Sequence, residues 1–363
     1  MNFLTEITEK SLGTYLAKKD WEQRYYVDFF PLKYTPFLDF ETLIGEGGVS
    51  AADLVAYNTS APEKTRRVVD RLRGSIPPIR VKRIMDEKKL NEYNIIKHTA
   101  QNDADMQALF DLVYNDVDFC VESVQQRCEW LALQALSQAS VSLTKDNSAG
   151  VITESAVDFQ LPTANKEVVT AVNRKWTVAN ASTSKPITDI KTICQEARGK
   201  GVKIKHILMN PSKLTDFLAS EEVSAFIYGI MISESGITPG VAPTLETVNR
   251  VLTQSGLPDI LIMDCVIDIE TESHDISSVD PWTSKYVSFI PELPLGRFLH
   301  GPIGAEAVKD PGIIQSKTGH ILVQSISSQD PVMQKTVGLA NAFVSFDKIN
   351  QVWSLNTESN TSW

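Results

Sequence analysis

Residues 102–144 have the sequence NDADMQALFDLVYNDVDFCVESVQQRCEWLALQALSQASVSLT, which neither proline nor glycine interrupts. The spacing of its apolar residues puts them on one face of an α-helix. They are Met106, Phe110, Val113, Val117, Cys120, Val124, Cys128, Leu131 and Ala135. Asn102 or Asp103 can cap the first amides, and Asn147 and Gly150 can end the helix. The sequence therefore predicts one helix of about 40 residues and about 60 Å.

A helix of this length needs a structural use, because helices in globular proteins average about 11 to 12 residues. A membrane span is excluded by the charged residues along it, such as Asp111 and Arg127. A coiled coil is disfavoured because the apolar spacing slips after Val124 and the later stripe contains Trp130 and alanines. We therefore interpret the helix as a strut along which other parts of the same or a neighbouring subunit lie.

The composition is that of a soluble folded protein, with 42% hydrophobic and 22% charged residues in a chain of 363 residues. This length is sufficient for about two domains. The sequence contains no apolar run typical of a signal peptide or a membrane span, so we expect a cytoplasmic site of synthesis. A net charge of −10 argues against a nucleic-acid binder that uses the whole chain.

The short motifs of enzymes and metal sites are missing from the sequence, including the P-loop, the dinucleotide glycine pattern, G-x-S-x-G, H-E-x-x-H and the EF-hand loop. The five histidines are scattered singly, and we expect His206 to be a hydrogen-bonded histidine of a strand. The cysteines form no C-x-x-C pair and are interpreted as reduced core thiols. They are Cys120, Cys128, Cys194 and Cys265. We predict no catalytic, cofactor or metal site, and an unrecognised enzyme site within residues 186–311 stays open as an alternative.

Charge is distributed unevenly between two neighbouring segments. Residues 64–89 hold ten basic and three acidic residues, a balance of +7, whereas residues 98–126 hold six acidic residues and no lysine or arginine. The basic set that we expect to contact a neighbouring subunit is Arg66, Arg67, Arg71, Arg73, Arg80, Lys82 and Arg83. The acidic set on the long helix is Asp103, Asp105, Asp111, Asp116, Asp118 and Glu122. We favour subunit pairing over a solvated loop, and both over DNA contact, because residues 64–89 contain no aromatic side chain on which a base could stack.

The rest of the chain divides into recognisable segments. Residues 3–16 have helical spacing, residues 25–40 are aromatic and proline-broken and are expected to lie extended, and residues 51–97 suggest a two-stranded excursion. A hairpin is predicted over 150–170, and an α/β domain over 186–311. Strands are predicted over 320–327 and 336–346, and the polar residues 356–363 are expected to fray.

The order of these parts resembles that of the major capsid proteins of tailed phages, in particular the lambda-like capsid protein E family, which has the shell fold named after phage Hong Kong 97. The resemblance covers most of the chain. It rests on residues 29–30 and 34–37, the basic segment 66–83, the helix 116–143, Trp176 with residues 186–190, and residues 255–260, 289–291, 295–296, 323–325, 331 and 343–346.

The resemblance implies an α+β capsid shell fold with a long spine helix, an extended E-loop, a peripheral domain and an axial α/β domain. The implied segments are an N-terminal arm with the first peripheral strand (1–45), the E-loop (46–97), the peripheral domain with spine helix and hairpin (98–185), the axial domain (186–318), and a return to the peripheral domain with a C-terminal tail (319–363).

The function implied is that of a structural protein, without enzyme activity or cofactor, that forms the icosahedral head shell around packaged double-stranded DNA. The implied partners are other copies of the chain in hexamers and pentamers, a separate scaffolding protein, a portal protein and a decoration protein. Non-specific contact with DNA is also implied, and no membrane is involved. The implied location is the virion, assembled in the host cytoplasm. An encapsulin-like compartment shell remains the nearest alternative, because it shares the fold.

Overall fold

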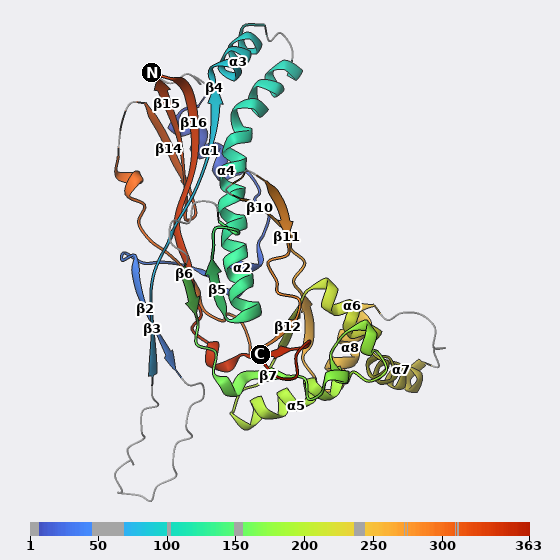
Figure 1. The fold of residues 1–363 in the computed structure, drawn as a ribbon. Helices are drawn as coiled ribbons and strands as arrows, with labels where there is room; N and C mark the ends of the chain where they lie inside the picture. The colour runs from blue at the N-terminus through green and yellow to red at the C-terminus, as the bar shows by residue number, and fades with distance from the viewer. Residues whose placement is uncertain are drawn as a thin grey trace, which may run out of the picture. The chain divides into compact units, whose positions relative to one another are not determined.

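A computed structural model describes residues 7–45, 69–99, 103–148, 155–235, 244–271, 273, 275–308, 310 and 312–363 (Figure 1). The chain forms two compact units. Unit 1 consists of Met1–Phe40, Arg73–Leu131 and Arg297–Ser345, and unit 2 consists of Glu41–Leu72, Ala132–Gly296 and Phe346–Trp363. These units do not coincide with the predicted segments, because residues 132–185 and 346–363 belong to the unit that also holds 186–296.

The long helix is present as the single helix α4, Asp103–Gln138, of 36 residues. Val113, Val117, Cys120, Val124 and Cys128 are buried, as the apolar spacing predicts, whereas Phe110 is exposed. The helix ends earlier than Asn147. Ala139 has a positive φ of 50°, and Ser140–Leu143 forms strand β5, which pairs with β6, Ser155–Asp158. The alternating sequence of residues 140–143 suits this hairpin better than another helical turn.

Unit 1 is built on a sheet whose central strand is β16, Val332–Ser345. Antiparallel partners of β16 are β4 (Pro78–Asp86), β15 (Ile321–Gln329) and β13 (Arg297–His300). Strand β14 (Ile313–Thr318) pairs with β15, and β1 (Leu32–Tyr34) pairs in parallel with β13. The strands predicted over 320–327 and 336–346 are therefore confirmed.

Three further helices belong to unit 1. Helix α1, Glu9–Lys18, begins at a capping box in which Thr8 and Ser11 bond reciprocally. It overlaps the segment 3–16 that was predicted to be helical. Helix α2, Tyr25–Phe29, lies where an extended segment was expected. The aromatic segment contains this helical turn because its prolines, Pro31 and Pro36, come after it. Helix α3, Glu87–Thr99, follows β4 directly.

Unit 2 contains a mixed five-stranded sheet in the order β7 (Lys166–Val168), β17 (Trp353–Asn356), β12 (Tyr286–Ile290), β8 (His206–Met209) and β9 (Asp259–Ile262). Its helices are α5 (Pro186–Gly199), α6 (Pro211–Ala219), α7 (Glu221–Ser235) and α8 (Leu245–Gln254). Trp176, Phe217, Phe289 and Trp353 lie in its core. Strands and helices follow one another after residue 186 as expected, but residues 297–311 of the predicted α/β domain belong to unit 1, and β7 and β17 come from outside the predicted range.

Besides the β5–β6 pair, two further strand pairs stand apart from these sheets. Strand β10 (Ile267–Glu270) pairs with β11 (Ile276–Val279), and β2 (Asp39–Gly45) pairs with β3 (Val69–Ser75). Five short 3-10 turns complete the described structure, at Thr163–Asn165, Val172–Arg174, Val178–Asn180, Gly304–Ala307 and Ile349–Gln351.

Candidate inter-subunit surfaces

The basic residues predicted to contact a neighbour lie in two places. Arg66 and Arg67 fall outside the described residues, and Arg71 and Arg73 belong to β3. Arg80, Lys82 and Arg83 belong to β4, which pairs with β16 and is therefore a strand of the sheet of unit 1. This differs from the two-stranded excursion expected over 51–97. Half-buried Val81 and buried Met85 give β4 an apolar side, which suits a strand at the edge of a packed sheet.

Arg83 finds its acidic partner within the same chain. Its guanidinium Nη1 lies 3.4 Å from Oδ1 of Asp116, and its Cζ lies 3.6 Å from the ring centroid of Phe119, both on α4. Stacking on an aromatic face and a carboxylate contact together position the arginine. These two charges, predicted to pair between subunits, therefore pair inside unit 1.

A second cluster joins α1 to α4. The Tyr15 hydroxyl donates to the Asp118 carboxylate at 2.7 Å, and Lys19 Nζ lies 2.6 Å from Asp118 and 3.8 Å from Glu122. Burial and the adjacent Asp118 carboxylate raise the pKa of Tyr15, so the phenol stays protonated and keeps donating. The Tyr15 ring also stacks at 4.2 Å from that of Tyr114. Asp118 is thus used to hold α1.

The remaining predicted acids are nearer the start of α4. Asp105 is half-buried, and Asp111 is exposed and accepts from Gln107 Nε2 at 2.6 Å. Asp103 is the first residue of the helix. Of the six acids, Asp111 and Glu122 are the ones with clearly exposed side chains among those that the structure describes.

Glu129 is a structural residue that sequence reasoning missed. Its side chain is buried on α4 and accepts from the backbone N–H groups of Tyr25, at 3.1 Å, and Tyr26, at 2.9 Å, the first two residues of α2. Burial raises the pKa of Glu129, while the two backbone N–H groups and Arg24 oppose the rise. The sequence did offer one sign of this role, because Glu129 is an acidic residue between two residues that a core would bury, Cys128 and Trp130.

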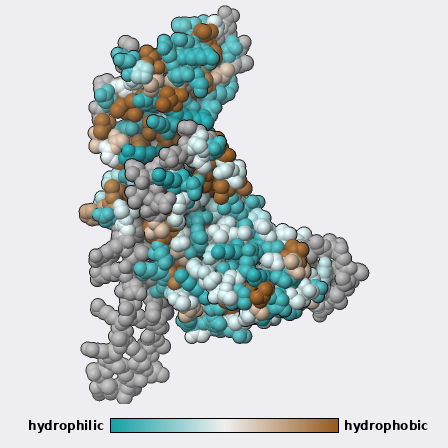
Figure 2. All heavy atoms as spheres, in the orientation of Figure 1, coloured by the Kyte–Doolittle hydropathy of each residue, from teal (hydrophilic) through white to brown (hydrophobic). Residues whose placement is uncertain are grey.

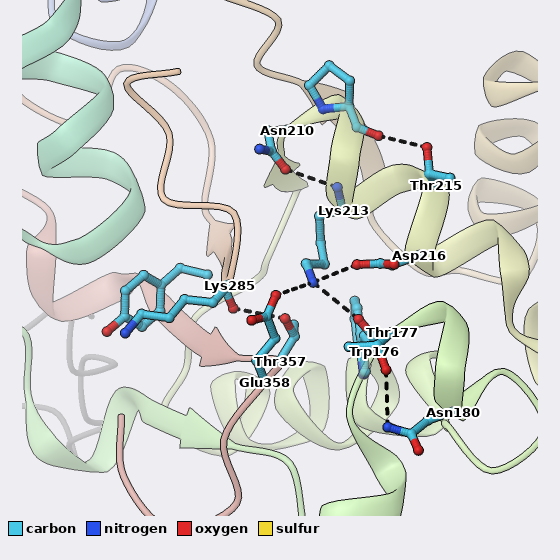
Figure 3. Close-up of polar contacts among 12 residues, drawn as sticks. Trp176, Thr177, Asn180, Asn210, Lys213, Thr215, Asp216, Lys285, Thr357 and Glu358 are labelled. Carbon is cyan, nitrogen blue, oxygen red and sulfur yellow. Dashed lines mark hydrogen bonds and ion pairs between the residues drawn. The ribbon is translucent and has the colours of Figure 1, made fainter. Parts of the chain in front are cut away.

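Lys213 is a buried cation in unit 2 that the sequence did not indicate either. Its Nζ, on α6, lies 2.8 Å from Asp216 and 2.8 Å from Glu358, and donates to the Trp176 carbonyl at 3.1 Å (Figure 3). Next to Glu358, Thr357 is buried and its Oγ1 donates to the Lys285 carbonyl at 2.9 Å. The expected fraying of residues 356–363 is therefore wrong, because Lys213 and β17 anchor this segment.

None of the four cysteines forms a disulfide. Cys120 and Cys128 are buried as predicted, whereas Cys194 and Cys265, also predicted as core thiols, are half-buried. Burial raises the pKa of Cys120 to about 12 and that of Cys194 to about 11. Cys128 Sγ lies 3.6 Å from His320 Nε2, and burial also lowers the pKa of His320 to about 4. A protonated thiol beside a neutral imidazole is the resting pair at neutral pH, so this contact packs the core and does not activate a nucleophile.

His206 is hydrogen-bonded, as predicted, through its Nδ1 to Asp259 at 2.7 Å. Over the described ranges, no group of three or more His, Cys, Asp or Glu residues could hold a metal ion. A search of the same residues finds no helix with the length and apolarity to cross a bilayer.

Comparison with known proteins agrees with the predicted resemblance. Residues 29–253 match the family described as phage major capsid protein E. No curated protein matches the chain.

Many solved structures share the fold, among them the following two. One is a putative capsid protein of a prophage of E. coli CFT073, with 13% identity, a TM-score of 0.57, and coverage of 96% of this chain and 99% of that chain. The other is a phage-related protein of Bordetella bronchiseptica RB50, with 10% identity, a TM-score of 0.56, and coverage of 97% of each chain. The predicted α+β capsid shell fold is confirmed.

Proposed function

The chain belongs to the family of phage major capsid protein E, and on that premise we propose that its copies assemble as hexamers and pentamers into the icosahedral shell around packaged double-stranded DNA. The observation that carries the proposal is the family match over residues 29–253, which includes the whole of α4 and β4. The fold supports the proposal, because the long helix α4 packs against the sheet of unit 1 and would stiffen the subunit of a shell.

A capsid protein is a structural component of the virion, and we propose that this chain has no catalytic role. The pairs that resemble catalytic groups have structural explanations. Burial keeps Cys128 protonated beside His320, and Lys213 is neutralised by two carboxylates. Each group is thus satisfied by its own surroundings.

We further propose that the basic segment around Arg66, Arg67, Arg71 and Arg73 contacts the acidic side of α4 in a neighbouring copy. Among the described acids of this set, Asp111 and Glu122 have exposed side chains, although Glu122 also lies 3.8 Å from Lys19 of its own chain. Asp116 and Asp118 are half-buried and paired within their own chain. Individual exposed ion pairs contribute only about 0 to 1 kcal/mol, so the pairing would act through many repeated contacts in a shell.

We also propose partners and a place of assembly for the shell. A separate scaffolding protein would direct shell curvature, a portal protein would occupy one vertex, and a decoration protein would bind outside. Packaged DNA would meet the inner surface without sequence preference. Assembly would take place in the cytoplasm of the bacterial host.

Electron microscopy tests the proposed function directly. The chain is expressed alone and together with the genes beside it, and each preparation is purified and imaged. Closed shells of uniform diameter in either preparation are the expected result. Only monomers or amorphous aggregates in both would contradict a shell-forming role.

A further inference from the structure

In the β10–β11 hairpin of unit 2, strand β10 has one buried and one open side, whereas β11 is exposed along its length. Ile267 and Ile269 point to the buried side. Side chains alternate along a strand, so Asp268 and Glu270 point to the opposite side, where they lie across from Ser278 and Ile276 of β11. Both acids are exposed.

This outer face combines exposed aliphatic groups with negative charge. Ile276 is 69% exposed, and Val266, just before β10, is 64% exposed. Ser278 Oγ donates to Asp268 Oδ1 at 2.5 Å, which holds that carboxylate on the outer face. Residues 264–280 hold six acidic residues and no lysine or arginine. Two-stranded hairpins are marginally stable alone, so contact with a partner surface would stabilise this one.

Strand β4 of unit 1 presents a face of matching character. Arg80, Lys82 and Ile84 alternate onto one side of the strand, opposite to Arg83, which contacts α4. Arg80 and Lys82 are exposed, and Ile84 is 44% exposed. On the same side, buried Leu339 lies across from Arg80, half-buried Val337 lies across from Lys82, and half-buried Lys335 lies across from Ile84. Exposed Asp86 follows Ile84 along β4. The exposed row is therefore basic at Arg80 and Lys82, aliphatic at Ile84 and acidic at Asp86.

We propose that the outer face of the β10–β11 hairpin docks onto the outer face of β4 in a second copy of this chain. The two acids would meet Arg80 and Lys82, while Ile276, which lies across from Glu270, would cover Ile84. Opposite charges steer the two faces together and set their register, and the aliphatic contacts exclude water. The proposal rests on the proposed function, since it names one contact by which copies would join. It differs from the pairing of the basic segment with α4, because the structure describes the residues of both of its faces.

The partner that we propose for each face is a second copy of this chain. The chain carries both complementary faces, so repetition of one heterologous contact, head to tail, generates rings when the rotation closes. A contact of this kind suits the hexamers and pentamers of a shell.

Charge exchange tests the contact. The hairpin variant Asp268→Lys/Glu270→Lys and the strand variant Arg80→Glu/Lys82→Glu should each lose shells, and the combined four-residue variant should regain them. The variant Asp146→Lys/Glu292→Lys makes the same change in charge at two exposed acids elsewhere and should assemble like the wild type. Circular dichroism and thermal unfolding show whether each variant is folded. A combined variant that assembles no better than the two single-face variants would overturn the proposal.

Crosslinking supplies a readout that does not depend on shell yield. In a Cys194→Ser/Cys265→Ser background, chains carrying Ile276→Cys are mixed with chains carrying Ile84→Cys and treated with a short bis-maleimide, both in assembled particles and in concentrated solution. A covalent dimer is expected from this pair, and none when Ile84→Cys is replaced by Val172→Cys, an exposed position outside both faces. Shells without the covalent dimer would refute the docking alone, whereas a covalent dimer without shells in any preparation would refute the proposed function.

Discussion

Gly338 of β16 lies against the backbone of Cys120 in α4 so closely that a β-carbon on Gly338 would be 2.7 Å from the Cys120 carbonyl oxygen. Cys120 Sγ contacts the carbonyl of Thr336 at 3.5 Å, two residues along the same strand. The spine helix thus crosses the sheet of unit 1 at a point where backbone nearly touches backbone.

Substitution of Gly338 should separate helix from sheet. We expect Gly338→Ala to lower the free energy of unfolding by about 1 to 3 kcal/mol, because the rigid backbone at Cys120 must move to admit the methyl group. Chemical denaturation of the unassembled subunit measures the loss. Gly304→Ala serves as the control, since nothing lies within 4 Å of a β-carbon there. Equal stability of the two variants would contradict the close crossing.

Proline inside α4 should break the helix. Val121 is fully buried in the middle of α4, and Val121→Pro should cost about 3 kcal/mol or more through the lost hydrogen bond and the clash of its ring. Circular dichroism and thermal unfolding report helicity and stability. Val121→Ala trims the same side chain without disturbing the backbone, so a proline variant no worse than the alanine variant would argue against one continuous helix.

Removal of the buried cation should free the C-terminal segment. Lys213→Met leaves the Trp176 carbonyl and two carboxylates without their donor, and we expect a loss of about 1 to 3 kcal/mol. Limited proteolysis followed by mass spectrometry should show faster cleavage near Glu358. The exposed lysine variant Lys203→Met is the matched control, and unchanged cleavage in Lys213→Met would show that other contacts hold the segment.

A pair of carboxyl groups should make the stability of unit 2 depend on pH. Glu167 of β7 is hydrogen-bonded to Glu196 of α5, and burial followed by the nearby Glu196 charge raises the pKa of Glu167 to about 7. A pKa raised in the folded state stabilises the fold at low pH, and this contribution is lost as pH rises from the unfolded value of about 4.5 through 7.

The variant Glu167→Gln should therefore be more stable than the wild type at pH 8, by about 1 kcal/mol once solvent screening is counted, and should lose that advantage at pH 5. Urea denaturation at both pH values measures the difference. Glu92→Gln, at an exposed site, should show no such dependence on pH. If Glu167→Gln changed the free energy of unfolding by the same amount at both pH values, a raised pKa of Glu167 in the folded state would be ruled out.

Charge reversal in the basic segment should impair assembly without unfolding the chain. The variant Arg66→Glu/Arg67→Glu/Arg71→Glu/Arg73→Glu should stay monomeric or form few shells, because like charges would then face α4 of the neighbour. Sedimentation and electron microscopy give the particle yield. Four exposed lysines elsewhere provide the control when changed to glutamate, namely Lys10, Lys18, Lys145 and Lys203. Wild-type yield from the arginine variant would reject the pairing.

The local elements were predictable because their causes are local. The apolar spacing of α4 is visible within one window, and α5 and α6 each begin at a proline, with Asn210 capping α6 through the Lys213 N–H. The order of such elements carried the family resemblance. The uneven charge between residues 64–89 and 98–126 was likewise apparent from the sequence, and it indicated contact surfaces without indicating the partners.

By itself, then, the sequence determined the spine helix, the α/β character after residue 186, the buried thiols and the capsid fold class. Only the tertiary structure showed that β4 pairs with β16 and that Arg83 and Lys19 form ion pairs with acids of α4 in their own chain. The ion pair between Lys213 and Glu358 was likewise visible only there. The reason is that these contacts join residues far apart in the chain, such as Ile79 and Ala340. Hydrophobic periodicity records which face of a segment is buried, but it carries no information about the segment that covers it.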